Sequence, residues 1–298
     1  MRRDVEFKSS GVTCRAWLHE PDASITRPAP CIVMAHGLGG TRHDAIEPYA
    51  QRFCEAGFFV LVFDYRHQGD SDGEPRQLFS IPRQLEDWAA AIKFARQWTN
   101  IDPRRIALWG TSLSGGHVVV VASKDRRVAA IAAQCPMMDG RASTQMARRA
   151  SGPGNFMRLG FAAINDALRA SFGLTPKYVP LVAPHGELAA MASADAYEGY
   201  TALVQPMWRN EVAARLFLSL PFYRPVSYAK GVECPSLVIV CLKDSVTSTR
   251  ATEAVAARIG DKARLLKLPI GHFDIYKGKW FERSSQEQVE FFKDALHK

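Results

Sequence analysis

Short apolar runs alternate with longer amphipathic segments along the first part of the chain. The apolar runs are rich in β-branched and aromatic residues, which predicts strands at 31–34, 58–63, 106–109 and 128–134. The longer segments predict helices at 45–56 and 82–98, and in the second of these Leu85, Trp88 and Ile92 recur at the spacing of one helical face. Strands joined by helical crossovers form parallel sheets, so the pattern predicts an α/β fold with a mostly parallel sheet flanked by helices.

The alternation stops at residue 137 and resumes near residue 231. The stretch 137–230 is too long for a loop and too rich in methionine and aromatic residues for a linker, so we expect an inserted helical cap with helices at 161–172 and 210–220. Its apolar residues are expected mainly to form the core of the cap itself. Residues 1–136 and 231–298 are predicted to form the α/β core.

The C-terminal part of this core continues the alternation. Strands are predicted at 236–240 and 263–268, with a helix at 249–258 between them. A last helix is expected to begin at Ser284, because Ser284 and Glu287 have the spacing of a capping box.

Composition narrows the class of protein. With 47% hydrophobic residues among 298 and a net charge of +8, intrinsic disorder is excluded. The basic residues occur singly or in isolated pairs rather than as a stripe that would neutralise successive phosphates, so we expect no nucleic-acid binding.

The six cysteines lack metal-ligand spacing and are expected to be buried thiols. No secretion signal and no apolar run of membrane-spanning length is present, so we expect a cytoplasmic protein.

The segment 110–116, Gly-Thr-Ser-Leu-Ser-Gly-Gly, joins a predicted strand to a predicted helix. A serine at the tip of such a turn has strained backbone angles, and small residues two positions before and after it let strand and helix approach closely. Gly110 and Ser114 occupy those positions, which makes Ser112 the candidate nucleophile. The four valines at 118–121 favour a strand by propensity, but they must be helical if Ser112 lies at this turn.

A serine nucleophile needs a base, and the base needs an acid that orients it. His272 follows the predicted strand 263–268 and Asp244 follows the strand 236–240, so both lie at carboxyl ends of parallel strands, where α/β sites form. The order serine, acid, histidine along the chain also suits this chemistry. Asp139, which follows the strand 128–134, is the alternative acid, and we favour Asp244.

A glycine-rich segment, His-Gly-Leu-Gly-Gly at 36–40, follows the strand 31–34. We expect the backbone N–H of Leu38, together with that of Leu113 beside the nucleophile, to form an oxyanion hole. The alternative is that the glycines only permit a tight turn.

Taken in order along the chain, these motifs resemble the α/β-hydrolase fold superfamily. They are His-Gly at 36–37, Asp-Tyr-Arg-x-x-Gly-x-Ser-x-Gly at 64–73, the segment 110–116, Asp244, and Gly-His at 271–272. The segment 110–116 resembles that of dienelactone-hydrolase-like esterases, bacterial peptidase-like hydrolases and fungal polyketide acyltransferases. Dienelactone hydrolases proper have a cysteine where this chain has Ser112. The resemblance implies acyl transfer through a serine ester.

The sequence therefore predicts a serine hydrolase that cleaves carboxylic esters through an acyl-enzyme intermediate, without a metal or organic cofactor. A thioesterase, an acyltransferase or a carbon–carbon bond hydrolase would use the same triad, and a non-catalytic binding protein is the remaining alternative. Met137 and Met138 are expected to line a pocket for the apolar acyl group of a small ester or thioester. Whether the chain forms a homodimer is left open.

Overall fold

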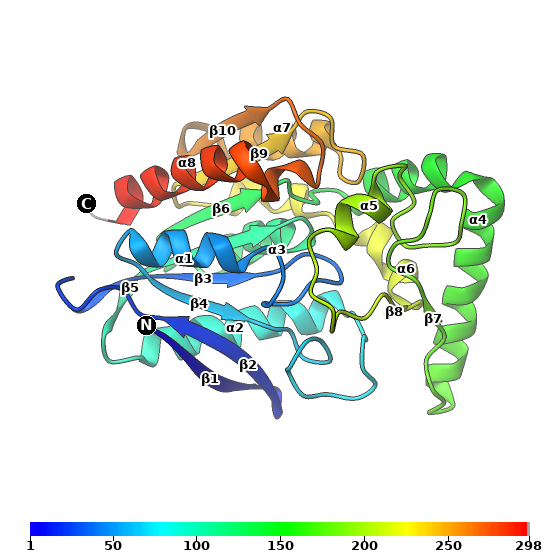
Figure 1. The fold of residues 1–298 in the computed structure, drawn as a ribbon, viewed down its shortest axis with the longest axis horizontal. Coiled ribbons are helices and arrows are strands. Elements are labelled where there is room, and N and C mark those ends of the chain that lie inside the picture. The colour runs from blue at the N-terminus through cyan, green and yellow to red at the C-terminus, as the bar shows by residue number, and fades with distance from the viewer. Residues whose placement is uncertain (297–298) are drawn as a thin grey trace.

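Eight strands form one sheet in the computed structural model, which describes residues 1–296 (Figure 1). The strand order is β1-β2-β4-β3-β5-β6-β9-β10, with β1 and β2 antiparallel to their neighbours and the remaining pairs parallel. The predicted, mostly parallel sheet is thus confirmed. The strands are β1 Arg2–Ser9, β2 Val12–His19, β3 Ala29–Ala35, β4 Phe59–Phe63, β5 Ile101–Thr111, β6 Ala130–Gln134, β9 Ser236–Cys241 and β10 Ala263–Leu268.

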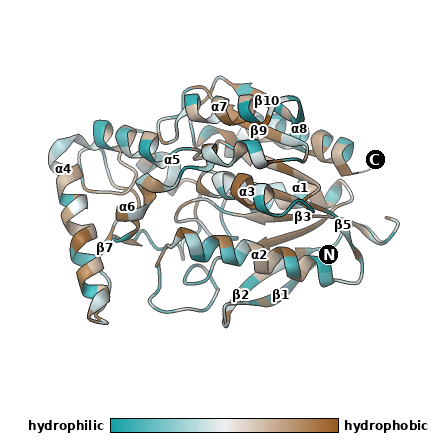
Figure 2. Ribbon diagram, turned by 180° about the vertical axis from the view of Figure 1, so that it is seen from behind, coloured by the Kyte–Doolittle hydropathy of each residue, from teal (hydrophilic) through white to brown (hydrophobic). Residues whose placement is uncertain are grey.

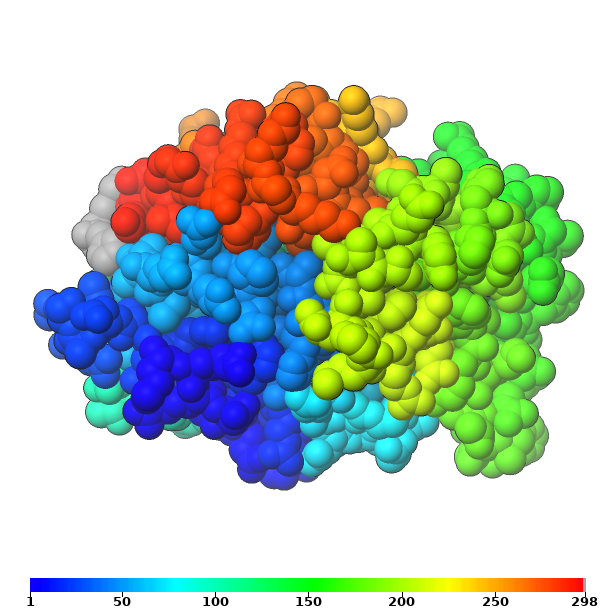
Figure 3. Space-filling view, in the orientation of Figure 1, coloured from blue at the N-terminus to red at the C-terminus, as the bar shows by residue number. Residues whose placement is uncertain are grey.

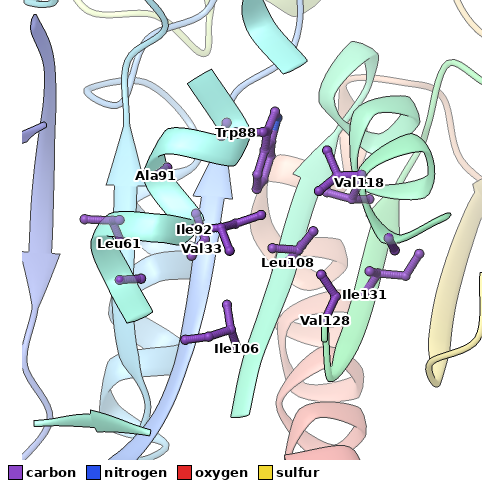
Figure 4. Close-up of a cluster of buried hydrophobic side chains, with 14 of the residues drawn as sticks. Val33, Leu61, Trp88, Ala91, Ile92, Ile106, Leu108, Val118, Val128 and Ile131 are labelled. Carbon is purple, nitrogen blue, oxygen red and sulfur yellow. The ribbon is translucent and has the colours of Figure 1, made fainter. Parts of the chain in front are cut away.

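Helices cover both faces of the sheet (Figure 1). One face packs against α1 (Glu47–Glu55) and α8 (Gly278–Leu296), and the other against α2 (Ile81–Gln97), α3 (Leu113–Lys124) and α7 (Thr249–Ile259). Figure 4 shows the second of these layers, in which Trp88 of α2 and Val118 of α3 lie over strand residues such as Leu108. Among residues 1–296, no helix has the length and apolar character that a membrane crossing requires.

The valines at 118–121 are helical, as the position of Ser112 requires. All four are buried, and the helix that carries them packs on the sheet between its neighbours. Burial against the sheet outweighs the modest helix propensity of valine.

The segment expected to be an insertion, residues 137–230, lies between β6 and β9, and most of it forms one end of the molecule (green to yellow-green in Figures 1 and 3). Met138, Val226 and Ala229, near its two ends, pack instead in the core layer with α3 and α7. The segment contains α4 (Gly140–Ser171), β7 (Tyr178–Val179), α5 (Ala196–Thr201), β8 (Val212–Ala213) and α6 (Leu216–Ser219). Gly152 has a non-helical φ of 75° inside α4 and precedes Pro153, so α4 consists of two helical segments that meet at a kink.

Two expected helix positions are wrong. The segment 210–220 is not one helix. The backbone of β8 pairs with β7, and the Ala213 N–H donates to the Gln77 carbonyl, so these groups are not available for helical hydrogen bonds. The α-helix in this segment is therefore only the single turn of α6. The last helix begins at Gly278 rather than at Ser284. Ser284 is buried inside this helix, where its hydroxyl bonds to the Tyr49 hydroxyl at 2.7 Å.

Candidate active site

Ser112 lies at the turn between β5 and α3, with φ 54° and ψ −118°. A positive φ is costly for a residue other than glycine, and such strain persists only where the surrounding packing imposes it. A side chain at Gly110 would collide with the Ser114 carbonyl, and a Cβ at Gly115 would come within 2.6 Å of the Pro136 Cβ. These two glycines are therefore what lets the chain turn sharply and present Ser112.

Ser114 replaces the second glycine of the usual turn sequence, and its side chain has a specific place. Its buried hydroxyl shares a hydrogen bond with the Tyr65 hydroxyl, which also accepts a 2.8 Å hydrogen bond from Trp88 Nε1. This network ties α2 and the segment after β4 to the first turn of α3, next to Ser112. No local pattern in the sequence signals this contact, because Tyr65 and Ser114 are far apart in the chain.

The structure brings Ser112, His272 and Asp244 into one hydrogen-bonded series. The Ser112 hydroxyl donates to His272 Nε2 at 3.2 Å, and His272 Nδ1–H donates to Asp244 Oδ2 at 2.7 Å. His272 follows β10 and Asp244 follows β9, so the sheet order places both loops beside the turn after β5. The histidine and aspartate side chains are only 4% and 2% exposed, which strengthens the electrostatic interaction between them.

Asp244 is itself held firmly by its own loop. Its Oδ1 accepts hydrogen bonds from the Val246 and Thr247 N–H groups at 2.8 and 2.7 Å, and its Oδ2 accepts one from the Thr247 hydroxyl at 2.9 Å. These bonds satisfy the carboxylate and orient Oδ2 toward His272.

The alternative acid, Asp139, has a different position and a different set of partners. It is the N-cap of α4, where Oδ1 accepts from the Arg141 and Ala142 N–H groups, and its Oδ2 pairs with Arg224. The structure therefore brings Asp244, and not Asp139, to the histidine.

The charge of Asp244 changes the proton affinity of His272. Burial lowers the pKa of the imidazole, but the adjacent Asp244 carboxylate and other acidic groups nearby outweigh it and raise the pKa to about 9. The arrangement therefore stabilises the protonated form of the imidazole.

The backbone of the β3–α1 loop lies against Ser112. A Cβ at Gly37 would stand 2.8 Å from the Ser112 Cβ, so Gly37 permits the approach of the Leu38 peptide. The Leu113 N–H begins α3 and has no acceptor within that helix. Leu38, Ser112 and Leu113 line the same cavity, which places both expected oxyanion-hole residues beside the serine.

The insertion holds this loop in place through a set of hydrogen bonds. The Tyr200 hydroxyl donates to the Leu38 carbonyl and Trp208 Nε1 donates to the Gly39 carbonyl, each at 2.7 Å. The Gln205 N–H donates to Asp44 Oδ1 at 3.0 Å. Segment 200–208 therefore fixes the loop that carries Leu38, a connection of which the sequence carries no signal.

Two cavities meet at Ser112. The larger has a volume of about 1050 Å³, counting the solvent space at its mouth, and is lined mainly by apolar residues of α4, α6 and the segments 190–193 and 220–221. Several hydroxyl side chains also line it, namely Ser143, Thr144, Ser193, Ser245 and Thr247. Met137 is among these, whereas Met138 lies in the buried cluster between the sheet and α2 and α3, so only the first of the two expected methionines faces the cavity. The smaller, of about 490 Å³, is lined by His272, with residues of the β3–α1 loop and α5.

Other polar groups near the site have structural partners. Thr111 lines the smaller cavity and bonds to the Tyr276 hydroxyl, while His67 pairs with Arg83. His43, Asp64 and Asp70 bring possible metal-ligand atoms within 4.8 Å of one another. The Arg42 guanidinium, however, lies 2.7 Å from Asp70 and 3.4 Å from Asp64, so the protein already supplies positive charge there.

Comparison with known proteins decides the family. The sequence profile of the serine aminopeptidase S33 hydrolases matches residues 26–272, most of the chain. The chain belongs to the serine aminopeptidase S33 family. Its α/β-hydrolase fold, expected from the ordered motifs, is thereby confirmed.

This S33 chain has relatives with several named activities. It is 42% identical to the quorum-quenching protein AidA of Acinetobacter baumannii over 97% of this chain and 94% of that protein. It is 28% identical to the thiohydrolase aneE of Aspergillus aculeatus, covering 98% and 93% of the two chains. The crystal structure of the α/β hydrolase GrgF from Penicillium sp. superposes with a TM-score of 0.84 at 23% identity over the whole of both chains, which shows the shared fold.

Proposed function

We propose that this S33-family hydrolase cleaves carboxylic esters of small molecules through an acyl-enzyme intermediate on Ser112. The observation that supports this most directly is the hydrogen-bonded series from Asp244 through His272 to Ser112, with the Ser112 hydroxyl 3.2 Å from the imidazole. A serine positioned on a strained turn beside an imidazole is the arrangement that acyl transfer requires. In this proposal, the insertion serves as the cap over the site.

Each residue of the series has a defined chemical task. His272 Nε2 takes the hydroxyl proton as Ser112 Oγ attacks the carbonyl carbon, and the Leu38 and Leu113 N–H groups bind the oxyanion. When the tetrahedral intermediate collapses, the bond to the leaving oxygen breaks and His272 gives its proton to that oxygen. Water then repeats the sequence on the acyl-enzyme, which releases the acid and restores Ser112.

The two cavities set the orientation of the substrate. His272 must protonate the leaving group, and it lines the smaller cavity rather than the larger. The alcohol part of the ester therefore belongs in the smaller cavity, beside Thr111 and Phe273. The acyl chain then extends into the larger cavity, whose apolar walls suit a hydrocarbon group of medium or greater length.

Thioesters form the second candidate class of substrate. The same serine would attack a thioester, and relatives of this chain include a thiohydrolase and a polyketide transferase. The 42% identical relative is a quorum-quenching protein, and hydrolysis of an ester bond in a signal molecule is one reaction of the proposed chemistry that would inactivate that molecule. Linear esters, lactones and thioesters with matched acyl chains therefore form the substrate panel.

The test combines turnover with covalent labelling. Wild type is assayed on this panel from short to long acyl chains, beside Ser112→Ala, and a fluorophosphonate adduct is located by mass spectrometry. We expect labelling at Ser112, loss of turnover in the variant, and free acid as product even with competing alcohols or amines present. Transfer of the acyl group to the competitor would assign an acyltransferase, and undiminished turnover by Ser112→Ala would exclude the serine mechanism.

A further inference from the structure

The second segment of α4, which lies at one end of the molecule (Figure 1), carries large apolar residues at regular intervals (brown bands between teal and white ones along α4 in Figure 2), and their side chains are exposed. These large side chains are 51–77% exposed, although all but Phe172, the C-cap residue, belong to the helix itself. The members of the α4 stripe are Met157, Phe161, Ile164, Leu168 and Phe172. The expectation that the apolar residues of the insertion mainly form its own core does not hold for this set.

The spacing of the α4 stripe is that of a helix-pairing seam. Its members follow one another at intervals of four, three, four and four residues, which keeps them within one narrow face of the helix. Alternation of three- and four-residue steps is the pattern by which side chains of one helix fit between those of another. The helix is thus shaped to receive a second helix.

The area of the α4 stripe approaches what a stable contact needs. Five side chains of this size, exposed to this extent, leave roughly 600 Å² of apolar surface, at the upper end of what a monomer ordinarily shows. A specific interface of standard size covers about 800 Å² on each partner. The stripe alone therefore supplies about three quarters of that area.

We propose that the α4 stripe is the interface of a symmetric homodimer, in which α4 packs antiparallel against α4 of a second copy. A two-fold contact covers the same patch on both chains at once, and an antiparallel seam of this spacing is complementary to itself. Ile164 lies at the midpoint of the stripe and so at the two-fold axis, while Phe161 faces Leu168 of the partner subunit and Met157 faces Phe172 of the partner subunit.

Dimerisation through this helix would also support the larger cavity. The opposite face of α4 contributes Phe156, Leu159 and Ala163 to the cavity wall. A partner helix behind that wall would restrain its outward movement, which gives the contact a role in holding the shape of the site.

Sedimentation velocity across the micromolar range tests the proposal. We expect wild type to sediment at twice the 33.0 kDa of the chain and Phe161→Asp to sediment as a monomer. Phe222→Asp is the matched control, because Phe222 is even more exposed, at 81% against 71% for Phe161, but lies outside the stripe. The control is expected to remain dimeric.

Disulfide cross-linking tests the geometry without a destabilising charge. Ile164→Cys is expected to form a covalent dimer on mild oxidation, and Met157→Cys to form one only when mixed with Phe172→Cys. A monomeric wild type, or a dimer that survives Phe161→Asp while Ile164→Cys does not cross-link, would overturn the proposal. A monomeric wild type that binds anionic phospholipid vesicles, with binding lost in Phe161→Asp, would assign the stripe to a lipid surface instead.

Discussion

Replacing Asp244 by asparagine tests the proposal that Asp244 is the acid of the triad. Because Oδ1 accepts two backbone N–H groups, those of Val246 and Thr247, the amide oxygen of the new side chain will take that position. Its NH₂ group then faces His272 Nδ1, which must become an acceptor. The imidazole proton is therefore held on Nε2, in the tautomer that has no lone pair available for the Ser112 proton.

The expected loss in rate follows from charge and tautomer together. With charge centres about 4 Å apart and an effective dielectric constant near 20, the Asp244 carboxylate stabilises the imidazolium by about 4 kcal/mol. Both side chains are almost completely buried, so solvent does little to screen this interaction. That energy corresponds to roughly a thousandfold in kcat, and the wrong tautomer brings the expected loss to between about 10³ and 10⁴.

The assay is hydrolysis of a p-nitrophenyl ester by Asp244→Asn and Asp139→Asn beside wild type, with circular dichroism and thermal melting to confirm folding. Asp139→Asn is the matched control, since asparagine is also a good N-cap and should preserve α4. We expect the control to keep kcat near that of wild type. If Asp244→Asn kept more than about a tenth of the wild-type kcat, or if Asp139→Asn lost as much activity, the assignment of the acid would be refuted.

Three further predictions follow from other contacts. Tyr200→Phe removes the hydrogen-bond donor to the Leu38 carbonyl, so we expect steady-state kinetics to show kcat about tenfold lower with little change in KM. The control is Tyr197→Phe, on the exposed side of the same helix, which should leave both constants unchanged. Gly160 lines the larger cavity and a Cβ there would meet no atom within 4 Å, so Gly160→Leu would place a side chain in the cavity. The value of kcat/KM should then fall for esters with long acyl chains and persist for those with short ones. The Tm should not fall, because leucine favours a helix more than glycine does. The value of kcat/KM should fall as the pH is lowered through the raised pKa of His272, about 9, because only the neutral imidazole accepts a proton. A fall in kcat/KM that begins only at or below pH 6.5, the ordinary pKa of histidine, would contradict this.

Local patterns in the sequence were sufficient to predict most of the α/β core. Strand and helix periods are properties of neighbouring residues, and so is the need for small residues around a strained serine turn. The antiparallel edge strand β1 was not predicted, because the charged residues that alternate with Val5 and Phe7 hide its apolar pattern. The helix expected at 210–220 failed for a related reason, since pairing of β8 with distant backbone replaced local helical bonds.

Within the site, the sequence by itself singled out Ser112, His272 and Asp244 through their positions after strands and their order along the chain. Only the tertiary structure decided which of two aspartates reaches the histidine, because that depends on the loop that orients each carboxylate. The Tyr65–Ser114 bond and the contact of Tyr200 with Leu38 were likewise decided by packing. They join residues 49 and 162 positions apart, and no short-range period can encode how such distant segments of the chain come together.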